Sequence, residues 1–239
     1  GLRVGLVTHP AGVDSALVPT IDRLAADERV SLVQLFGPEH GVRGDVAAGE
    51  DVSDARDPRT GVPVESLYGA RRRPSKESLE RIDVLLFDLQ DVGARMYTYI
   101  STLGEVMTAA GEAGVKVVVL DRPNPLGGLR FEGPVMPEEW ESFISWGSLP
   151  MTHGMTMGEI ARLWKERRVV SCELDVVRMS GWERSMVWED TGLEWLQSSP
   201  HIPHPVNAHL YLATGAIGES FEGVHCGVGY TTPFQVLAA

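Results

Sequence analysis

The sequence has few cysteines and no long apolar run. Cys172 and Cys226 are its only cysteines among 239 residues, which is too few for a disulfide framework, and their spacing fits no CxxC zinc pattern. No segment approaches the ~20 consecutive apolar residues that a membrane-spanning helix needs. Positive charge is also scarce, since 21 Lys and Arg face 33 Asp and Glu for a formal net charge of -12. We therefore expect neither nucleic acid nor an acidic membrane surface as a partner.

Several familiar catalytic and cofactor motifs are missing as well. "THPAGVD" follows the first apolar run, where a dinucleotide-binding protein would carry G-x-G-x-x-G, so a nucleotide-dependent enzyme is the weakest of our hypotheses. The sequence contains no P-loop, no H-E-x-x-H and no G-x-S-x-G. His201 and His204 stand three residues apart in "HIPHP", but the prolines prevent a helix and no acidic residue adjoins them. We expect no metal site and no cofactor.

Four short apolar runs are present, and they recur between helix-like segments. They are "LRVGLVT" (2–8), "VSLVQLF" (30–36), "DVLLFDL" (83–89) and "VKVVVLD" (115–121). Each run is apolar nearly throughout, which is typical of strands covered on both faces in a parallel sheet. The segments "SALVPTIDRLAAD" and "YTYISTLGEVMTAAGEAG" have helical spacing, and the second ends in the glycine that often terminates a helix. The pattern predicts an α/β, Rossmann-like, doubly wound and mainly parallel sheet with helices on both faces.

The second half of the chain is less regular. "THGMTMGEIARLWKER" predicts a further helix, with Thr156 and Glu159 forming a capping box, and "CELDVVRM" (172–179) predicts another strand. From about residue 181 tryptophan, proline and histidine replace periodicity. We therefore divide the chain into a Rossmann-like catalytic domain over residues 1–180 and an irregular segment over residues 181–239. We expect that segment to lead into a smaller C-terminal domain that is truncated here.

The polar residues that stand out follow the predicted strands. "GPEHGVRGD" follows the second, "QDVGARMYTY" the third and "RPNPLGG" the fourth. Ligands of open parallel sheets bind beyond the carboxyl ends of the strands. We therefore expect one site at that edge, containing Glu39, His40, Arg43, Asp91, Arg95, Asp121, Arg122 and Asn124. His153, before the predicted capping box, is either structural or part of the same crevice.

Ordinary structural roles compete with each of these assignments. Glu39 could pair with Arg43, the aspartates could satisfy loop amides, and Asp121 could cap the turn before "RPNP". Carboxylates gathered with arginines nevertheless suit acid–base chemistry on a sugar or similar polyol.

The order of several longer motifs carries a family resemblance. "THPAGVD", "FGPEHGVRG", "AGEDVSD", "TGVPVESLYG", "IDVLLFDLQDVGARMYTYISTL", "LDRPNPLGG", "EGPV" and "SLPMTHGMTMGE" occur in sequence over residues 1 to about 159. The chain resembles the exo-β-N-acetylmuramidase family, which is NamZ-like and also known as DUF1343 or YbbC-like. The resemblance implies a Rossmann-like catalytic domain that releases terminal N-acetylmuramic acid from the non-reducing end of peptidoglycan fragments. A cell-wall substrate favours a secreted, periplasmic or cell-wall location, although a bacterial cytoplasmic one fits a recycling role.

By the same resemblance Glu39 is the leading catalytic residue, and we assign it as the general acid. Asp91 or Asp121 is expected to be the second carboxylate, and Tyr97 matches a family motif position in the same crevice, where we expect it to bind substrate. The lactyl carboxylate of N-acetylmuramic acid calls for an arginine, and Arg43, Arg95 and Arg122 are the candidates, with Arg95 preferred. Retaining, inverting and substrate-assisted routes all remain open.

Two departures from the family motifs favour a competing hypothesis. Val228 stands where the family's final glycine-rich motif carries an arginine, and "PHIPHP" only loosely matches the family's "NMP"-type stretch. A sugar- or peptidoglycan-binding module that kept the fold and lost catalysis is therefore the alternative function.

Overall fold

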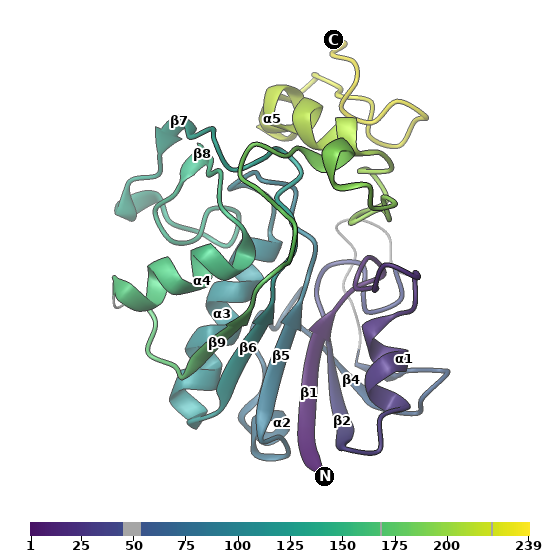
Figure 1. Ribbon diagram of the computed structural model, residues 1–239. Coiled ribbons are helices and arrows are strands. Elements are labelled where there is room, and N and C mark those ends of the chain that lie inside the picture. Colours follow the sequence, from purple (N-terminus) through teal and green to yellow (C-terminus); the bar gives the residue numbers. More distant parts are fainter. Residues whose placement is uncertain (45–53, 168, 221) are drawn as a thin grey trace.

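The computed structural model describes residues 1–44, 54–167, 169–220 and 222–239. Its centre is a seven-stranded sheet in the order β3-β4-β2-β1-β5-β6-β9 (Figure 1). The strands are β1 (Leu2–Thr8), β2 (Val30–Gly37), β3 (Ala55–Arg56), β4 (Pro63–Ser66), β5 (Val84–Asp88), β6 (Lys116–Leu120) and β9 (Leu174–Val177). All neighbours pair in parallel except β3 with β4. The mainly parallel α/β prediction and all five predicted strands are confirmed.

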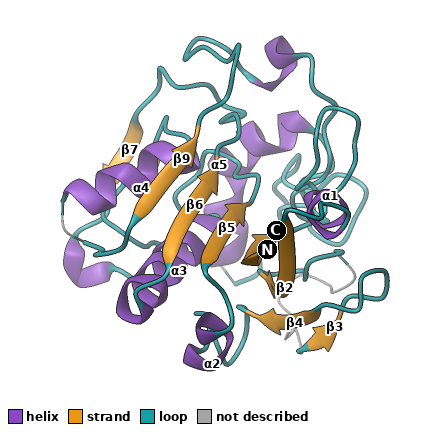
Figure 2. Cartoon of the chain, turned by 60° about the horizontal axis from the view of Figure 1, so that its bottom comes forward, coloured by secondary structure: helices purple, strands orange, loops and turns teal. Residues whose placement is uncertain are grey.

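Helices cover both faces of this sheet, as predicted. On one side lie α2 (Lys76–Glu80), α3 (Tyr99–Ala113) and α4 (Met157–Glu166), and on the other lies α1 (Thr20–Ala25) (Figure 2). Alternate strand residues divide accordingly. Val7 and Phe36 pack into the core beneath α3 and α4, whereas Leu6 and Leu35 pack with Ile21 of α1. This period of two is what a strand buried on both faces requires.

The α1 face is only partly covered. Over β6 and β9 the outward side chains remain accessible, since Val118 and Leu120 are half-buried and Val177 is 55% exposed. The short α1 contributes to this, because the predicted helix over residues 15–27 begins only at Thr20. Asp14 instead forms a turn by accepting hydrogen bonds from the backbone N–H groups of Ala16 and Val18.

The predicted helix ends agree with the structure. Gly114 terminates α3 in the left-handed conformation, with φ of 70°. Thr156 and Glu159 form the capping box at the start of α4. Both helix ends depend on residues that are close together in the chain, which is why the sequence alone predicted them.

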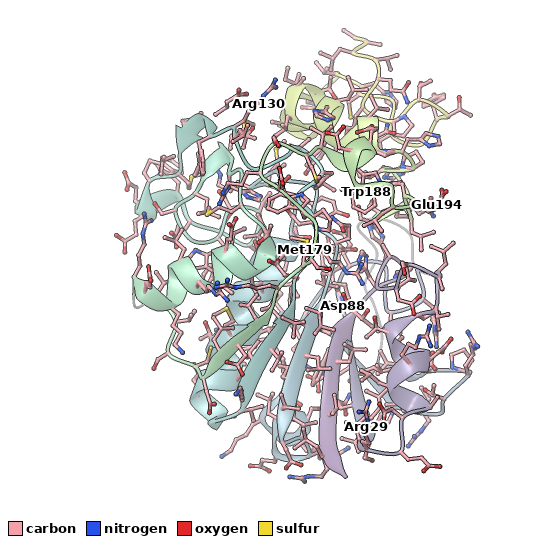
Figure 3. All side chains as sticks on the ribbon, viewed as in Figure 1. Arg29, Asp88, Arg130, Met179, Trp188 and Glu194 are labelled. Atoms are coloured by element: carbon pink, nitrogen blue, oxygen red, sulfur yellow. The ribbon has the colours of Figure 1, made fainter. Side chains whose placement is uncertain are left out.

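Residues 181–239 lie over the carboxyl ends of the strands (Figures 1 and 3). They contain η2 (Trp188–Thr191) and the 16-residue helix α5 (Pro205–Ser220). Sequence analysis missed α5, because Gly215 and Gly218 interrupt its periodicity. A side chain at Gly218 would collide with Cys226, as its Cβ would lie 2.3 Å from the Cys226 Sγ. The glycine therefore serves packing rather than a turn.

This segment has a core that it shares with the site loops. Ile202, Ala208, Cys226 and Phe234 pack with Val92, Ala94 and Leu126. The division at residue 180 stays a prediction. A small hairpin of β7 (Glu132–Val135) and β8 (Pro150–Thr152) stands beside the sheet, and the 3-10 helix η1 (Glu138–Trp140) lies in its loop. Within the described residues, no helix is both long and apolar enough to span a bilayer.

Close packing of α3 against the α4–β9 connection supports the first prediction. An alanine Cβ at Gly111 would lie 2.0 Å from the carbonyl oxygen of Ser171. Alanine normally favours a helix over glycine by about 1 kcal/mol. We expect Gly111→Ala to destabilise the protein nonetheless, by about 1–3 kcal/mol, because the backbone must move apart.

Thermal unfolding measures this effect, which corresponds to a Tm lower by roughly 3–8 °C. Glu112→Ala, at the exposed neighbouring position, is the matched control and should change Tm little. An unchanged or higher Tm for Gly111→Ala would contradict the packing argument.

Candidate active site

The loop after β2 places Glu39 at the edge of the sheet. Pro38 and Gly41 form a tight turn through a 2.9 Å hydrogen bond from the Gly41 N–H to the Pro38 carbonyl. His40 has a φ of 74° within this turn and is 4% exposed. Glu39 itself is half-buried, and its Oε2 accepts a hydrogen bond of 3.3 Å from the hydroxyl of Thr98, just before α3. The carboxyl is thus held while remaining accessible.

Asp91 forms a buried pair with His153. The Asp91 Oδ2 lies 3.1 Å from Nε2 of His153 and accepts the Gly93 N–H at 2.7 Å. The His153 Nδ1 accepts the Met155 N–H at 3.2 Å, so the ring proton is on Nε2 and is donated to Asp91. His153 is fully buried, and Asp91 Oδ1 has no hydrogen-bond partner among the described residues. The pair fixes the direction of one carboxyl, whose second oxygen is buried without a partner among the described residues.

Two tyrosines at the start of α3 meet at Ser198. Tyr97 and Tyr99 contact each other edge-on, 4.7 Å between ring centres, and both reach Ser198. The Tyr97 hydroxyl donates to the Ser198 Oγ at 3.0 Å and the Tyr99 hydroxyl to the Ser198 carbonyl at 2.7 Å. Burial raises the pKa of Tyr99, and the nearby charges of Glu39 and Asp91 raise it further.

His9 completes this arrangement, although sequence analysis did not select it. Its Nε2 accepts the Gln90 N–H at 2.8 Å, and its ring meets the edge of Tyr99 at 5.1 Å. Burial, reinforced by Arg122, lowers the pKa of His9 to about 3, so the ring is neutral. The signal for His9 was its place in "THP" directly after the first strand. We call these residues the strand-end cluster: Glu39, His40, Thr98, Tyr99, His9, Asp91, His153, Tyr97 and Ser198.

Asp121, Arg122 and Asn124 have mainly structural contacts. Asp121 accepts hydrogen bonds from the Thr156 hydroxyl and the Gly158 N–H, and thereby joins the end of β6 to the start of α4. Burial raises the pKa of the Asp121 carboxyl. The side-chain amide of Asn124 donates to the Met155 carbonyl and accepts the Leu126 N–H, so it joins two stretches of backbone. Of the two predicted partners of Glu39, Asp91 is the one that lies in the strand-end cluster.

The three arginines are engaged within the protein. Arg43 donates to Asp57 at 2.7 Å and to Asp22 at 3.3 Å, and Arg122 donates to Asp88 at 2.6 Å. Arg95 instead donates to the carbonyls of Pro134 and Leu149, at 2.7 and 2.6 Å. It contacts no carboxylate among the described residues, and its Nε there has no partner. Burial lowers the pKa of Arg95.

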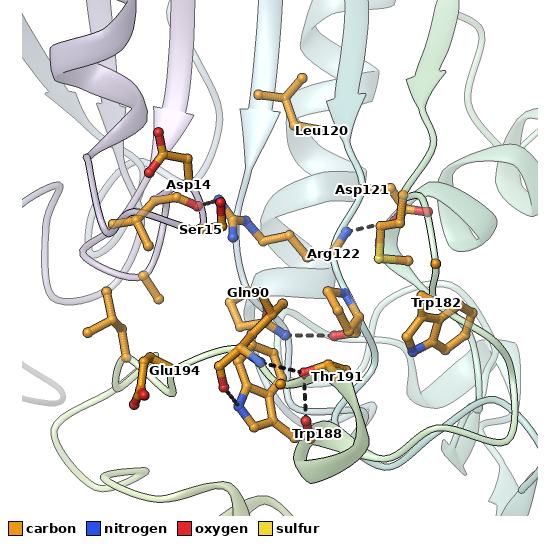
Figure 4. A pocket seen from close by; sticks show the side chains of 18 of the residues that line it. Asp14, Ser15, Gln90, Leu120, Asp121, Arg122, Trp182, Trp188, Thr191 and Glu194 are labelled. Carbon is orange, nitrogen blue, oxygen red and sulfur yellow. Dashed lines mark hydrogen bonds between the residues drawn. The ribbon is translucent and has the colours of Figure 1, made fainter.

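A cavity of about 480 Å³ adjoins the strand-end cluster on the α1 side (Figure 4). Its lining includes Asp14, Asp88, Gln90, Asp121, Arg122 and Trp182. Glu39 and Asp91 are not part of the lining. We call it the Trp182 cavity. Gln90 joins the two regions, because its backbone N–H binds His9 while its side chain borders the cavity. Among the described residues no group of three or more His, Cys, Asp or Glu is placed to hold a metal ion.

Comparison with known proteins decides the family. A family model for "Exo-beta-N-acetylmuramidase NamZ, N-terminal" matches residues 4–206. The chain belongs to this family. The peptidoglycan β-N-acetylmuramidase NamZ of Bacillus subtilis (strain 168) is 45% identical over 241 residues, covering 100% of this chain and 57% of that protein. The resemblance drawn from the motifs is confirmed.

Two crystal structures of DUF1343 family proteins from Bacteroides fragilis NCTC 9343 share the NamZ N-terminal fold. BF0371 matches with a TM-score of 0.94 and 50% identity, and BF0379 with 0.83 and 28%. Each match covers all of this chain but only 61% and 62% of the other. The chain thus spans about three-fifths of the length of these relatives.

Val228 marks a difference from the NamZ-like motif. It is half-buried and packs against the core of residues 202, 208, 226 and 234. An apolar side chain at this point adds to packing where the motif has a guanidinium.

The pairing of Arg43 with Asp57 leads to a pH-dependent prediction. Burial acts to raise the pKa of Asp57, but hydrogen bonds from Arg43 and Thr60 outweigh it and lower the pKa from 3.8 to about 2. Because the folded pKa is depressed, this contribution to stability is present above the unfolded pKa and is lost as the pH falls towards 2. We expect Asp57→Asn to lower the free energy of unfolding by about 1–2 kcal/mol at neutral pH.

Urea unfolding at several pH values between about 3 and 7 tests this. The variant and the wild type should converge as the pH falls. Asp175→Asn serves as control, because that carboxylate is 64% exposed and pairs only at the surface with Lys116. Two curves that stay parallel down to the lowest pH would contradict the assignment.

Proposed function

We propose that this chain carries the catalytic centre of an exo-β-N-acetylmuramidase. Its substrate would be a peptidoglycan fragment with N-acetylmuramic acid at the non-reducing end. Membership of the NamZ N-terminal family supports this, as does the name of the 45%-identical relative. The observation that carries the proposal is that Glu39 and Asp91 follow β2 and β5, which both pair in parallel with β1 and therefore end at the same edge of the sheet.

Glu39 acts as the general acid in this proposal. It lies on a rigid turn, is half-buried and receives one hydroxyl hydrogen bond, so a substrate oxygen can approach it. Protonation of the glycosidic oxygen by Glu39 lets the bond to the anomeric carbon break, and the leaving sugar departs with the proton. Water then supplies the new oxygen on the anomeric carbon, and the proton that this water loses restores the carboxyl for the next turnover.

Asp91 is the proposed second carboxylate. His153 and Gly93 hold one of its oxygens, which leaves the unpartnered Oδ1 to face the positive charge that develops on the sugar ring or to orient the substrate's acetamide. His153 is a positioning residue here, because it acts through Asp91. The neighbouring His40 and Tyr97 complete the proposed wall of the site.

Arg95 is the proposed partner of the lactyl carboxylate. Arg43 and Arg122 already bind carboxylates inside the protein, and a second anion would compete with those pairs. Arg95 binds only carbonyl oxygens among the described residues and retains an unpartnered Nε. It therefore keeps uncompensated charge, which an anionic group stabilises.

Turnover of a chromogenic N-acetylmuramide tests the role of Glu39. Glu39→Gln should lower kcat by about 10²–10⁴-fold, because the amide keeps the hydrogen bond from Thr98 but has no proton to donate. Glu138→Gln, at an exposed position on η1, is the matched control and should retain wild-type activity. Wild-type turnover by Glu39→Gln would remove Glu39 from the mechanism. Tight binding of muramyl fragments by a wild-type chain that never releases sugar would favour the non-catalytic binding module.

Asp91→Asn and Asp121→Asn distinguish the two candidate second carboxylates. An asparagine at 91 can still accept from His153 and Gly93, so we expect a normal Tm with kcat lowered by about 10²-fold or more. Asp121→Asn should instead mainly lower Tm, because Asp121 joins β6 to α4. The reverse pattern in kcat and Tm would transfer the catalytic role to Asp121.

A further inference from the structure

Arg184 connects the segment after β9 with three parts of the chain near the edge of the sheet (Figure 1). Its Nη1 donates to the carbonyl oxygens of Gly128, at 2.8 Å, and Gly154, at 3.0 Å. Its Nη2 donates to the Oε1 of Glu159 at 2.6 Å. The Arg184 carbonyl in turn accepts the Gly128 N–H at 2.7 Å. One residue thus holds the loop after β6, the loop before α4 and the first turn of α4.

The contact with Gly154 leads to Asp91. The Gly154 carbonyl belongs to the same peptide group as the Met155 N–H, which donates to the Nδ1 of His153 at 3.2 Å. The Nε2 of His153 lies 3.1 Å from the Oδ2 of Asp91. A hydrogen bond to the carbonyl of a peptide group polarises that group and strengthens its N–H as a donor. A hydrogen-bonded path therefore runs from Arg184 through one peptide group and His153 to Asp91.

The loop after β6 leaves room for the arginine. A Cβ at Gly128 would lie 2.7 Å from the Nη1 of Arg184 and 3.0 Å from its Cγ. Gly127 has a φ of 76°, which explains a glycine there, but Gly128 has no left-handed backbone. The second glycine therefore provides space, and a side chain in its place would push the guanidinium away.

The acceptors indicate a role in orientation rather than in charge pairing. The Arg184 side chain is 44% exposed, and an exposed ion pair such as the one with Glu159 contributes little by itself. The two remaining acceptors are uncharged carbonyl oxygens in different loops. A guanidinium presents donors in a fixed plane and can meet all three acceptors, whereas a lysine ammonium concentrates its donors at one point.

We propose that Arg184 is a positioning residue, which orients Asp91 by fixing the peptide group that sets the tautomer of His153. While this peptide is held, the Nδ1 of His153 accepts its N–H, and the ring proton stays on Nε2 and points to Asp91. Without the guanidinium the peptide can rotate, and the ring can protonate Nδ1 instead, which deprives Asp91 of a donor. The consequence for catalysis rests on the proposed function, whereas the effect on His153 does not.

Nitrogen resonances of the imidazole ring test the proposal without reference to activity. The chain has seven histidines, and the His153 signals are assigned as those lost in His153→Gln. The wild type should show one tautomer, with the proton on Nε2. In Arg184→Ala the Nδ1 resonance should move to an intermediate position, because both tautomers become populated. Arg162→Ala removes an exposed arginine of α4 and is the matched control, which should leave the His153 signals in place.

Two further variants keep the test open if Arg184→Ala does not fold. Gly128→Ala displaces the guanidinium while Arg184 itself stays, so the His153 signals should move in the same direction. Arg184→Lys keeps the charge but cannot meet the three acceptors together, and it should give the same intermediate Nδ1 position. Each variant should lower Tm by roughly 2–6 °C, because contacts between loops are lost.

Added guanidinium ions separate orientation from general stability. Because the Arg184 side chain is 44% exposed, methylguanidinium can enter the space that Arg184→Ala vacates. At about 10 mM it should restore the wild-type His153 tautomer and raise kcat at least about threefold. Ammonium chloride at the same concentration lacks the planar donors and should do neither.

Kinetics with the chromogenic N-acetylmuramide test the catalytic consequence. Arg184→Ala should lower kcat by about 10-fold to 100-fold and change KM less than about threefold, because contacts with the substrate remain. In an Asp91→Asn background the same substitution should have little further effect, since the carboxylate that it orients is already gone.

Each outcome decides one of the two claims. The inference is overturned if the His153 signals of folded Arg184→Ala and Gly128→Ala keep their wild-type positions. It is equally overturned if the tautomer changes while kcat does not, or if Arg184→Ala lowers kcat as much in the Asp91→Asn background. A chain that cleaves no muramide, but whose His153 tautomer changes in Arg184→Ala, would refute the proposed function and leave the orienting role of Arg184 standing.

Discussion

Parallel pairing of β1 with β2 on one side and β5 on the other is the constraint on which the site depends. Because the three strands run in the same direction, their last residues, Thr8, Gly37 and Asp88, reach the same edge. The loops that follow supply His9, Glu39 and Asp91, which are spread over more than 80 residues of the sequence. The hydrogen bonds of the sheet therefore set the separation of the proposed site residues, and the loops need only short turns to present them.

The polar groups around this edge are mostly fixed by internal partners. Ser198 receives both tyrosine hydroxyls, and His153 holds one oxygen of Asp91. Such contacts order the side chains before any substrate arrives, which lowers the entropic cost of binding. Two of the three arginines are likewise held by partners inside the protein. Two of the three stabilise the fold through buried or half-buried aspartates, so an overall negative chain has little free positive charge near its site.

The sequence predicted the features that depend on neighbouring residues. Apolar runs revealed the strands, and the spacing of Thr156 and Glu159 revealed a helix start. Contacts between distant segments could not be predicted in this way. Arg43 looked available for a ligand because Asp57 and Asp22 come near it only in the folded chain. Ser198 carried no signal at all, and α5 was obscured by glycines whose purpose is to admit Tyr211 and Cys226.

The low pKa of His9 affects the charge near the site when the pH falls. Its ring stays uncharged until the solution is strongly acidic, since its pKa lies near 3. An ordinary histidine in this place would gain a proton between neutrality and pH 5 and would add a positive charge beside Tyr99. Burial prevents that, so His9 itself adds no positive charge beside Tyr99 when the surroundings become moderately acidic.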